Sequence, residues 1–196
     1  GFIASSLAFG NARAFERTVS SVLSLMGSSP YKFLLSFSPQ GDKGPFLPLG
    51  HRWVRGKDVV ALLSVLKAIL SRYGSLKALF MKGFTETEPS IASALSIFVE
   101  ECVGRIRSRD RRVRFFFPSP RDGSACKRMS LFLRWMVRDG DGVDVGIWPE
   151  VLRSELIVPL DTHIYRLSSY LGWTRRRSKD WRTAVEITQA LRQVDR

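Results

Sequence analysis

The sequence predicts an all-α fold, because three apolar stripes recur at helical spacing and only one short segment could be a buried strand. In each stripe apolar residues return three and four positions apart, which places them on one face of a helix. The stripes are Phe15, Val19, Val22, Leu23 and Met26; Val59, Leu62, Leu63, Leu66, Ile69 and Leu70; and Ile91, Leu95, Phe98 and Cys102. We expect these residues to form a core rather than a cofactor site.

Length and charge limit what such a fold can do. The 196 residues fit one domain, or one compact domain with two lobes and a cleft. The 31 Lys and Arg against 18 Asp and Glu give a net charge of +13, which favours a polyanionic partner, with nucleic acid as the leading candidate. No apolar run approaches the roughly 20 residues that cross a bilayer, and no signal peptide is visible, so we expect a cytoplasmic protein without a membrane partner.

The basic residues are concentrated in the second half of the chain. From Arg105 to Arg138 eleven Lys or Arg face only Asp110 and Asp122, a net of +9. A basic run is commonly a solvated loop. A second cluster, Arg175-Arg176-Arg177 with Lys179, leads us to favour contact with nucleic acid.

Within the first cluster, Phe115-Phe116-Phe117-Pro118-Ser119-Pro120 is interpreted as an extended connector, because its prolines disfavour a central strand. Adjacent phenylalanines usually enter a core, although aromatic rings beside arginines can also stack on bases. Two cysteines, Cys102 and Cys126, have no paired spacing and no companion histidines. We therefore expect no disulfide, no metal and no cofactor, and a packed rather than reactive Cys126.

The next predicted helix, from about Ser124 to Arg138, separates an apolar face from a cationic one. Lys127, Arg134 and Arg138 fall at i, i+7 and i+11, a single stripe. The inward face is Ala125, Met129, Leu133, Met136 and Val137. The following Asp139-Gly140-Asp141-Gly142 lacks the ligand ladder and terminal glutamate of a calcium loop, so we interpret it as a turn.

A further helix begins after Asp161. The apolar Leu156–Leu160 leads into it, and Ile164, Leu167 and Leu171 continue at helical spacing, which makes Asp161 the N-cap. Backbone N–H groups and the positive end of the helix would lower the pKa of this carboxyl. His163 and Arg166 lie on the first turn, where contact with phosphate suits them better than catalysis.

Several segments resemble a bacterial family of unassigned function, which in turn is similar to the helix-hairpin-helix-GPD superfamily of DNA glycosylases, including endonuclease III and the 8-oxoguanine glycosylases. The segments that carry the resemblance are Leu7–Asn11, His51-Arg52, Gly123–Arg128, Leu131–Arg138, Val143–Trp148, Pro159–His163, Asp180-Trp181 and Thr188–Arg192. The resemblance covers most of the chain. It implies a helix-hairpin-helix DNA glycosylase-like bundle over 1–196 as a single domain.

At two positions the resemblance implies specific roles. Lys127 matches the catalytic lysine of the bifunctional glycosylases, and Asp161 matches their essential aspartate. Gly123 and Ser124 would correspond to the hairpin whose backbone N–H groups hold a phosphate. From charge and position we expect further DNA contacts at Arg128, Arg134, Arg138, His163, Arg166, Arg175, Arg176 and Arg177.

The chain also departs from the superfamily pattern. Ser119-Pro120-Arg121-Asp122-Gly123 replaces the usual Leu-Pro-Gly-x-Gly hairpin, and the lysine falls four residues after the glycine. The 34-residue interval from Lys127 to Asp161 is closer to the archaeal 8-oxoguanine branch than to endonuclease III. Two cysteines cannot hold a four-cysteine iron–sulfur cluster.

The expected function is that of a monomeric, nucleoid-associated DNA repair glycosylase with AP lyase activity, which acts on damaged or abasic double-stranded DNA, with an oxidised purine as the leading lesion. A noncatalytic helix-hairpin-helix module that binds nucleic acid through its phosphates is an alternative. A protein-interaction scaffold with a basic surface is another. The chain starts at Gly1 without a methionine and stops at Arg196, so we expect relatives to extend past one or both ends.

Overall fold

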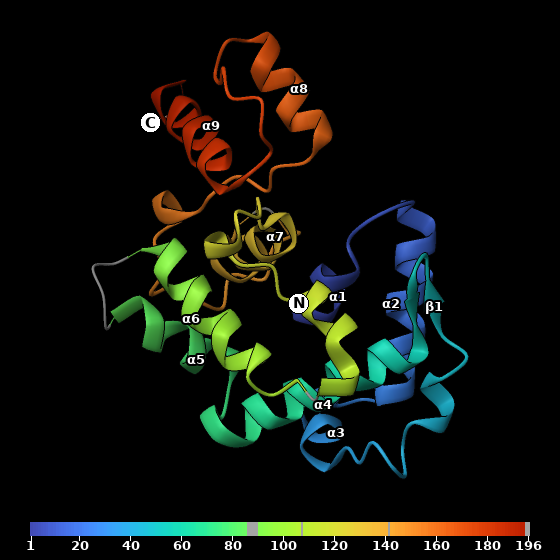
Figure 1. Ribbon diagram of the computed structural model, residues 1–196. Coiled ribbons are helices and arrows are strands. Elements are labelled where there is room, and N and C mark those ends of the chain that lie inside the picture. The colour runs from blue at the N-terminus through green and yellow to red at the C-terminus, as the bar shows by residue number, and fades with distance from the viewer. Residues whose placement is uncertain (86–89, 107, 141, 195–196) are drawn as a thin grey trace. The chain divides into compact units, whose positions relative to one another are not determined.

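The computed structural model describes residues 1–85, 90–106, 108–140 and 142–194, and over these residues the protein is all-α, as its stripes predict (Figure 1). Nine α-helices and one two-stranded antiparallel sheet lie in this part of the chain. The helices are α1 Phe2–Leu7, α2 Ala12–Met26, α3 Pro30–Ser36, α4 Gly56–Tyr73, α5 Leu76–Thr85, α6 Ile91–Val103, α7 Lys127–Val137, α8 Thr162–Tyr170 and α9 Trp181–Val194. The strands are β1 Gly50–His51 and β2 Val54–Arg55, and 3₁₀ turns lie at η1 Gly44–Phe46, η2 Ser108–Phe116, η3 Pro120–Asp122 and η4 Arg153–Glu155.

All five helices that the periodicity indicates are present, as α2, α4, α6, α7 and α8. The predicted start of α7 is three residues too early. Gly123 and Cys126 both have left-handed backbone, with φ of 70° and 51°, and a right-handed helix cannot pass through such residues. The helix therefore begins at Lys127.

By its internal contacts the chain divides into two compact units, which we name by their most informative features. The Lys127 unit comprises Gly1–Ser5, Gly83–Ser96 and Pro118–Arg196, and the hairpin unit comprises Ser6–Lys82 and Ile97–Phe117. The sequence of the hairpin unit contains 17 Lys and Arg against six Asp and Glu, a net of +11, whereas the Lys127 unit has 14 against 12, a net of +2. Nearly all of the excess positive charge thus belongs to the hairpin unit.

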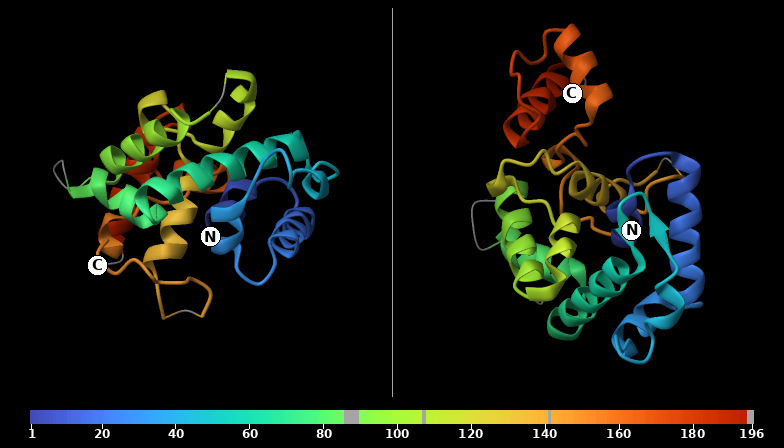
Figure 2. Two further views of the ribbon diagram at one scale, coloured as in Figure 1. Left: turned by 90° about the horizontal axis from the view of Figure 1, so that it is seen from below. Right: turned by 45° about the vertical axis from the view of Figure 1, so that its right-hand side comes forward.

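The core of the hairpin unit is built on α4. Its stripe residues Val59, Leu62, Leu63, Leu66 and Ile69 are all at least 98% buried. Helix α4 packs against α3 and η2, and α2 packs against β1 (Figure 2).

The start of α4 lies against the turn η1. A Cβ at Gly56 would overlap the carbonyl oxygens of Phe46 and Leu47, so the close approach requires glycine. Asp58 in the first turn accepts a hydrogen bond from the Arg55 amide at 2.9 Å and caps the helix.

The core of the Lys127 unit has two parts. Phe132 of α7 meets Phe2 and Trp148 edge to face, with ring centroids 5.2 Å apart in each pair. The other part is a cluster of Leu160, Ala184 and Ile187, on which partly buried residues of α8 and α9 pack. Helices α8 and α9 lie side by side around this cluster (Figure 1).

Among the described helices, none alone combines the length and the apolar composition needed to cross a membrane. Among the described residues, only α4 and Leu76–Phe84 of α5 taken together have that length and apolar composition. The two helices are bent by 68° relative to each other.

Candidate active site

Lys127 and Asp161 form an ion pair in the Lys127 unit. The Lys127 Nζ lies 3.3 Å from the Asp161 Oδ2, and the two side chains are 38% and 31% exposed. At this exposure the pair contributes less than about 1 kcal/mol to folding. Both groups remain open to a ligand, which a purely structural pair does not require.

The turn before α7 sets the position of Lys127. The Ser124 hydroxyl accepts a hydrogen bond from the Cys126 amide at 3.1 Å, and Cys126 occupies the N-cap position in left-handed conformation. Lys127 is consequently the first residue of α7, where its backbone N–H has no partner within the helix. Its side chain leaves the helix at the positive end of the dipole, facing Asp161.

Asp161 is the N-cap of α8, as predicted. Its Oδ1 accepts hydrogen bonds from the amides of His163 and Ile164, both at 2.9 Å. Burial acts to raise the pKa of Asp161, but the Ile164 amide, the charge and hydrogen bond of Lys127 and the His163 amide together hold it below its ordinary value. The group is therefore a carboxylate at neutral pH.

One apolar cluster supports both members of the pair. Leu160, which precedes Asp161, is 3% exposed and packs with Ala184 and Ile187 of α9. Ala125, two residues before Lys127, packs against the same cluster. Helix α9 thus fixes the approach of two segments that lie far apart in the sequence.

Two of the predicted DNA contacts, Arg134 and Arg138, are engaged within the protein. Their Nε atoms lie 3.3 and 3.7 Å from the Oδ2 of Asp144, whose side chain is only 1% exposed. Burying a carboxylate is unfavourable unless cations compensate it. These two members of the cationic stripe therefore have a structural role, and their contact with DNA stays a prediction.

Arg176, another predicted DNA contact, is also engaged within the protein. Its guanidinium contacts Asp180 at 2.8 Å and the Thr183 hydroxyl at 3.0 Å. Asp180 also accepts from the Thr183 amide at 2.9 Å, so it caps α9 while pairing with Arg176. Burial acts to raise the pKa of Asp180, but its hydrogen bonds to Ser178, Thr183 and Arg176 lower it strongly.

The remaining predicted contacts differ in accessibility. The side chains of His163, Arg166, Arg175 and Arg177 are exposed. Arg128 is half-buried, and burial lowers its pKa to about 10, which leaves it cationic at pH 7. The Gly123 amide donates to the Pro120 carbonyl at 3.1 Å, and the Ser124 hydroxyl is occupied by Cys126. The turn thus uses the Gly123 N–H, one of the two backbone groups that the resemblance assigns to a phosphate.

The cysteines contribute no reactive group. Both are free and buried, and burial raises the pKa of the Cys126 thiol to about 12, so it remains a protonated thiol. Within the part of the chain that the structure describes, no three His, Cys, Asp or Glu residues come together in a way that could hold a metal ion.

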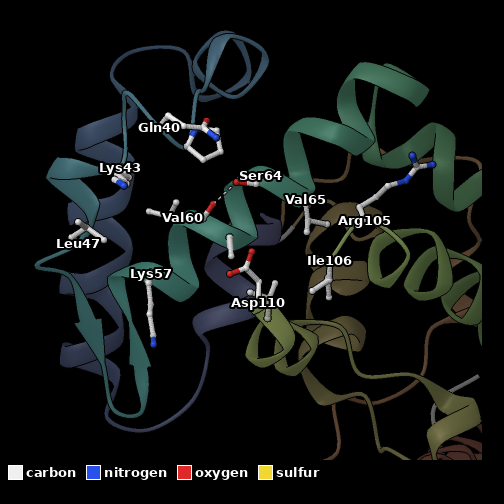
Figure 3. Close-up of a pocket in the computed structure, with 13 residues that line it drawn as sticks. Gln40, Lys43, Leu47, Lys57, Val60, Ser64, Val65, Arg105, Ile106 and Asp110 are labelled. Atoms are coloured by element: carbon white, nitrogen blue, oxygen red, sulfur yellow. Dashed lines mark hydrogen bonds between the residues drawn. The ribbon is translucent and has the colours of Figure 1, made fainter. Parts of the chain in front are cut away.

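Cavities of about 310, 270 and 210 Å³ lie in the hairpin unit, and neither Lys127 nor Asp161 lines any of them. The first lies beside α4 and has a floor that includes Val60 and Val65. In Figure 3 the side chains of Lys43, Lys57 and Arg105 are spread around its rim and do not converge on one point. This cavity has no arrangement of groups that indicates a reaction.

Asp144 and Asp180 were not predicted as partners of the arginines. Asp144 stands between Val143 and Val145 after a glycine turn, and an acid within such an apolar segment is a signal for an internal ion pair. Asp180 directly precedes the amphipathic helix α9, at the place where an N-cap belongs.

A family model described as "Protein of unknown function (DUF2400)" matches residues 1–196, the whole chain. No curated protein and no solved structure matches the sequence. On this match and with this helical fold, the chain belongs to the DUF2400 family.

Proposed function

We propose that the protein is a DNA glycosylase with AP lyase activity, in which Lys127 attacks the sugar of a damaged nucleotide and Asp161 assists. The observation that carries the proposal is the 3.3 Å contact between the Lys127 amine and the Asp161 carboxylate. These two residues are the ones at which the sequence resembles the catalytic pair of the helix-hairpin-helix-GPD glycosylases. The net charge of +13 further supports a nucleic acid as substrate.

The geometry suits the first step of this reaction. Attack requires a neutral amine, so Lys127 first releases a proton to solvent, to which both side chains are partly open, while Asp161 stays a carboxylate. Lys127 Nζ then bonds to the anomeric carbon while the base leaves with the electron pair of the glycosidic bond. Positive charge develops on the sugar, and a carboxylate beside it stabilises the transition state.

The second step follows from the covalent bond. Opening of the sugar ring converts the adduct into a Schiff base between Lys127 and the sugar. Loss of a proton from C2′ then expels the 3′ phosphate, which breaks the strand by β-elimination. The lysine is released by hydrolysis of the Schiff base. The substrate nucleotide must leave the duplex first, and an abasic or weakly paired site makes this easiest.

The test uses duplexes that contain an abasic site or 8-oxoguanine, incubated with the protein and borohydride. The parent is expected to form a covalent adduct, and Lys127→Gln is expected to form none. Asp161→Asn should react about 100-fold more slowly. Because asparagine caps helices as well as aspartate does, this variant removes the charge and keeps α8 in place.

The proposal is wrong if the parent forms no adduct with either duplex. Binding of the same duplexes by the parent and by Lys127→Gln, without any adduct, would instead support a noncatalytic nucleic-acid-binding module.

A further inference from the structure

The tip of the β1–β2 hairpin presents a large aromatic ring to solvent. Trp53 is 50% exposed although it lies between two buried residues of the hairpin, His51 and Val54. Arg52 before it has left-handed backbone, with φ of 55°, which is unusual for a residue other than glycine. Strained backbone of this kind is found preferentially at functional sites.

The exposed ring is held in one orientation. Phe9 stacks on it at 4.9 Å between ring centroids and 19° between planes, and Phe115 meets its edge at 5.6 Å. The Arg52 guanidinium lies 5.1 Å from the centre of the ring. A ligand that stacks here meets a fixed platform, so little conformational entropy is lost on binding.

The backbone beneath the ring is fixed as well. Arg112 donates to the Trp53 carbonyl at 2.6 Å and pairs with the carboxylate of Asp58 at 3.5 Å. His51 Nε2 donates to the Phe9 carbonyl at 2.7 Å, which ties the hairpin to the segment that carries the stacked ring. The hairpin is therefore supported from two segments that are distant in the sequence.

A cavity of about 210 Å³ adjoins this platform. It is lined by aromatic rings and one cation together with a buried acid: Trp53, Val54, Asp58, Arg112, Phe115 and Phe116. The Asp58 carboxylate is engaged by Arg112 and by the Arg55 amide, and the cation that lines the cavity is Arg112, which is 52% exposed. Aromatic walls with a few placed polar groups are typical of sites for flat ligands.

The positive charge around the Trp53 ring favours a flat ligand that is also anionic. Arg52, Arg55, Lys57, Arg112 and Arg114 are exposed, and Asp58, the acid that lines the adjoining cavity, is buried and paired. The hairpin unit as a whole has a net charge of +11. Aromatic rings interleaved with exposed cations match a strand whose phosphates are anionic and whose bases have free faces.

We propose that Trp53 and Arg52 form a stacking site for an unpaired base of DNA, with Arg112 beside it for the adjoining phosphate. The site rests on the proposed function only in the choice of DNA over other polyanions. In duplex DNA the faces of the bases are covered by their neighbours, so the site favours single-stranded over double-stranded DNA.

The test measures binding of a labelled oligothymidine over a range of salt concentrations, with a duplex of equal length for comparison. Trp53→Ala should weaken single-strand binding about tenfold or more. Because Trp53 is uncharged, the dependence of affinity on salt should keep its slope. Arg52→Gln removes the guanidinium beside the ring and should also weaken binding. Arg112→Gln removes the proposed phosphate contact and should reduce that slope by about one. The matched control is Tyr170→Ala, which removes an aromatic side chain that is 88% exposed in the Lys127 unit.

Two further measurements distinguish the loss of the stacking ring from misfolding of the Trp53→Ala variant. Trp53→Phe keeps a stacking ring and should bind within about threefold of the parent. In the parent, irradiation of a strand that carries 5-iodouracil should give a cross-link that peptide mapping places on residues 50–55. Unchanged binding by Trp53→Ala, or a cross-link outside the hairpin alone, would overturn the proposal.

The outcomes separate this site from the proposed function. A borohydride adduct together with full single-strand binding by Trp53→Ala removes the stacking site and leaves the glycosylase. Trp53-dependent binding without any adduct removes the glycosylase and leaves the stacking site.

Discussion

The Lys127 amine and the Asp161 carboxylate lie 3.3 Å apart although 34 positions separate them in the sequence. Each stands at the beginning of a helix, Lys127 as the first residue of α7 and Asp161 as the N-cap of α8. The cluster around Ala184 and Ile187 of α9 holds the segments that precede both residues. The contact is therefore a product of packing in the Lys127 unit, and it is partly open to solvent.

The capping role of Asp161 predicts a pH-dependent contribution to stability. Its pKa in the folded protein is lowered below the ordinary value of 3.8. A carboxylate of this kind stabilises the fold fully above pH 3.8, and the contribution is lost as the pH falls through the lowered pKa. Urea unfolding at pH 7 should show Asp161→Ala to be less stable than the parent by about 1 kcal/mol.

The same series contains its control. Asp161→Asn keeps the cap but not the charge, so its free energy of unfolding at pH 7 should lie between those of the parent and Asp161→Ala. The difference between the parent and Asp161→Asn should shrink as the pH falls below 3.8. A difference that grows in acid would contradict the assignment of the lowered pKa.

Substitution of Arg134 or Arg138 should lower the stability of the fold, because both arginines pair with the buried Asp144 carboxylate. Either arginine changed to glutamine leaves one cation at the buried Asp144 carboxylate, and we expect a loss of about 1 kcal/mol in the free energy of unfolding. The double variant should lose more than the sum, because the carboxylate then has neither arginine beside it. Chemical denaturation of the three variants measures this coupling, and simple additivity would show that Asp144 does not join the two arginines.

Gly56 should tolerate no side chain. In Gly56→Ala the new methyl group would overlap the Phe46 and Leu47 carbonyls, so η1 and the start of α4 must move apart. We expect a loss of about 2 kcal/mol or more in the free energy of unfolding. Gly74→Ala is a useful comparison, because a Cβ there meets no atom within 4 Å and only the positive φ of 73° opposes it. Thermal melting of both variants measures the two losses. Equal destabilisation would contradict the close approach of Gly56 to the Phe46 and Leu47 carbonyls.

The division of charge predicts which unit dominates salt-dependent DNA binding. Arg55→Gln with Lys57→Gln removes two exposed cations from the unit of net charge +11, and Arg175→Gln with Arg177→Gln removes two from the unit of +2. The first pair should reduce the slope of log affinity against log salt by about two. The second pair should reduce it less. A larger effect of the second pair would place the main phosphate contacts in the Lys127 unit.

Local patterns were sufficient to predict α2, α4, α6, α7 and α8 and the N-cap at Asp161, because these depend on residues close together in the sequence. The sequence analysis did not predict α1, α3, α5 and α9. The β1–β2 hairpin was not predicted, since two-residue strands leave no periodicity and the turn carries Arg52 where glycine is usual. Of the predicted cationic stripe, Lys127 and Arg134 lie in α7, whereas Arg138 is the C-cap residue just after it. The sequence alone did not reveal that Asp144 engages two of its members, because that depends on how a loop folds back on the helix.

The distribution of positive charge between the two units also could not be predicted from the sequence. The run from Arg105 to Arg138 is continuous in sequence, but it crosses the boundary between the two units at Phe117 and Pro118. Its densest part, up to Arg114, belongs to the hairpin unit and not to the unit of Lys127. Proximity in sequence therefore overstated the positive charge of the unit that contains the proposed nucleophile.

The most direct test of the account is the position of the covalent bond to DNA. The parent is reacted with an abasic duplex under borohydride, the adduct is digested, and the modified peptide is identified by mass spectrometry. We predict that the sugar is attached to Lys127, with a change of the exposed Lys32, Lys32→Gln, leaving the yield unchanged. Attachment to another lysine, or an undiminished yield in Lys127→Gln, would contradict it.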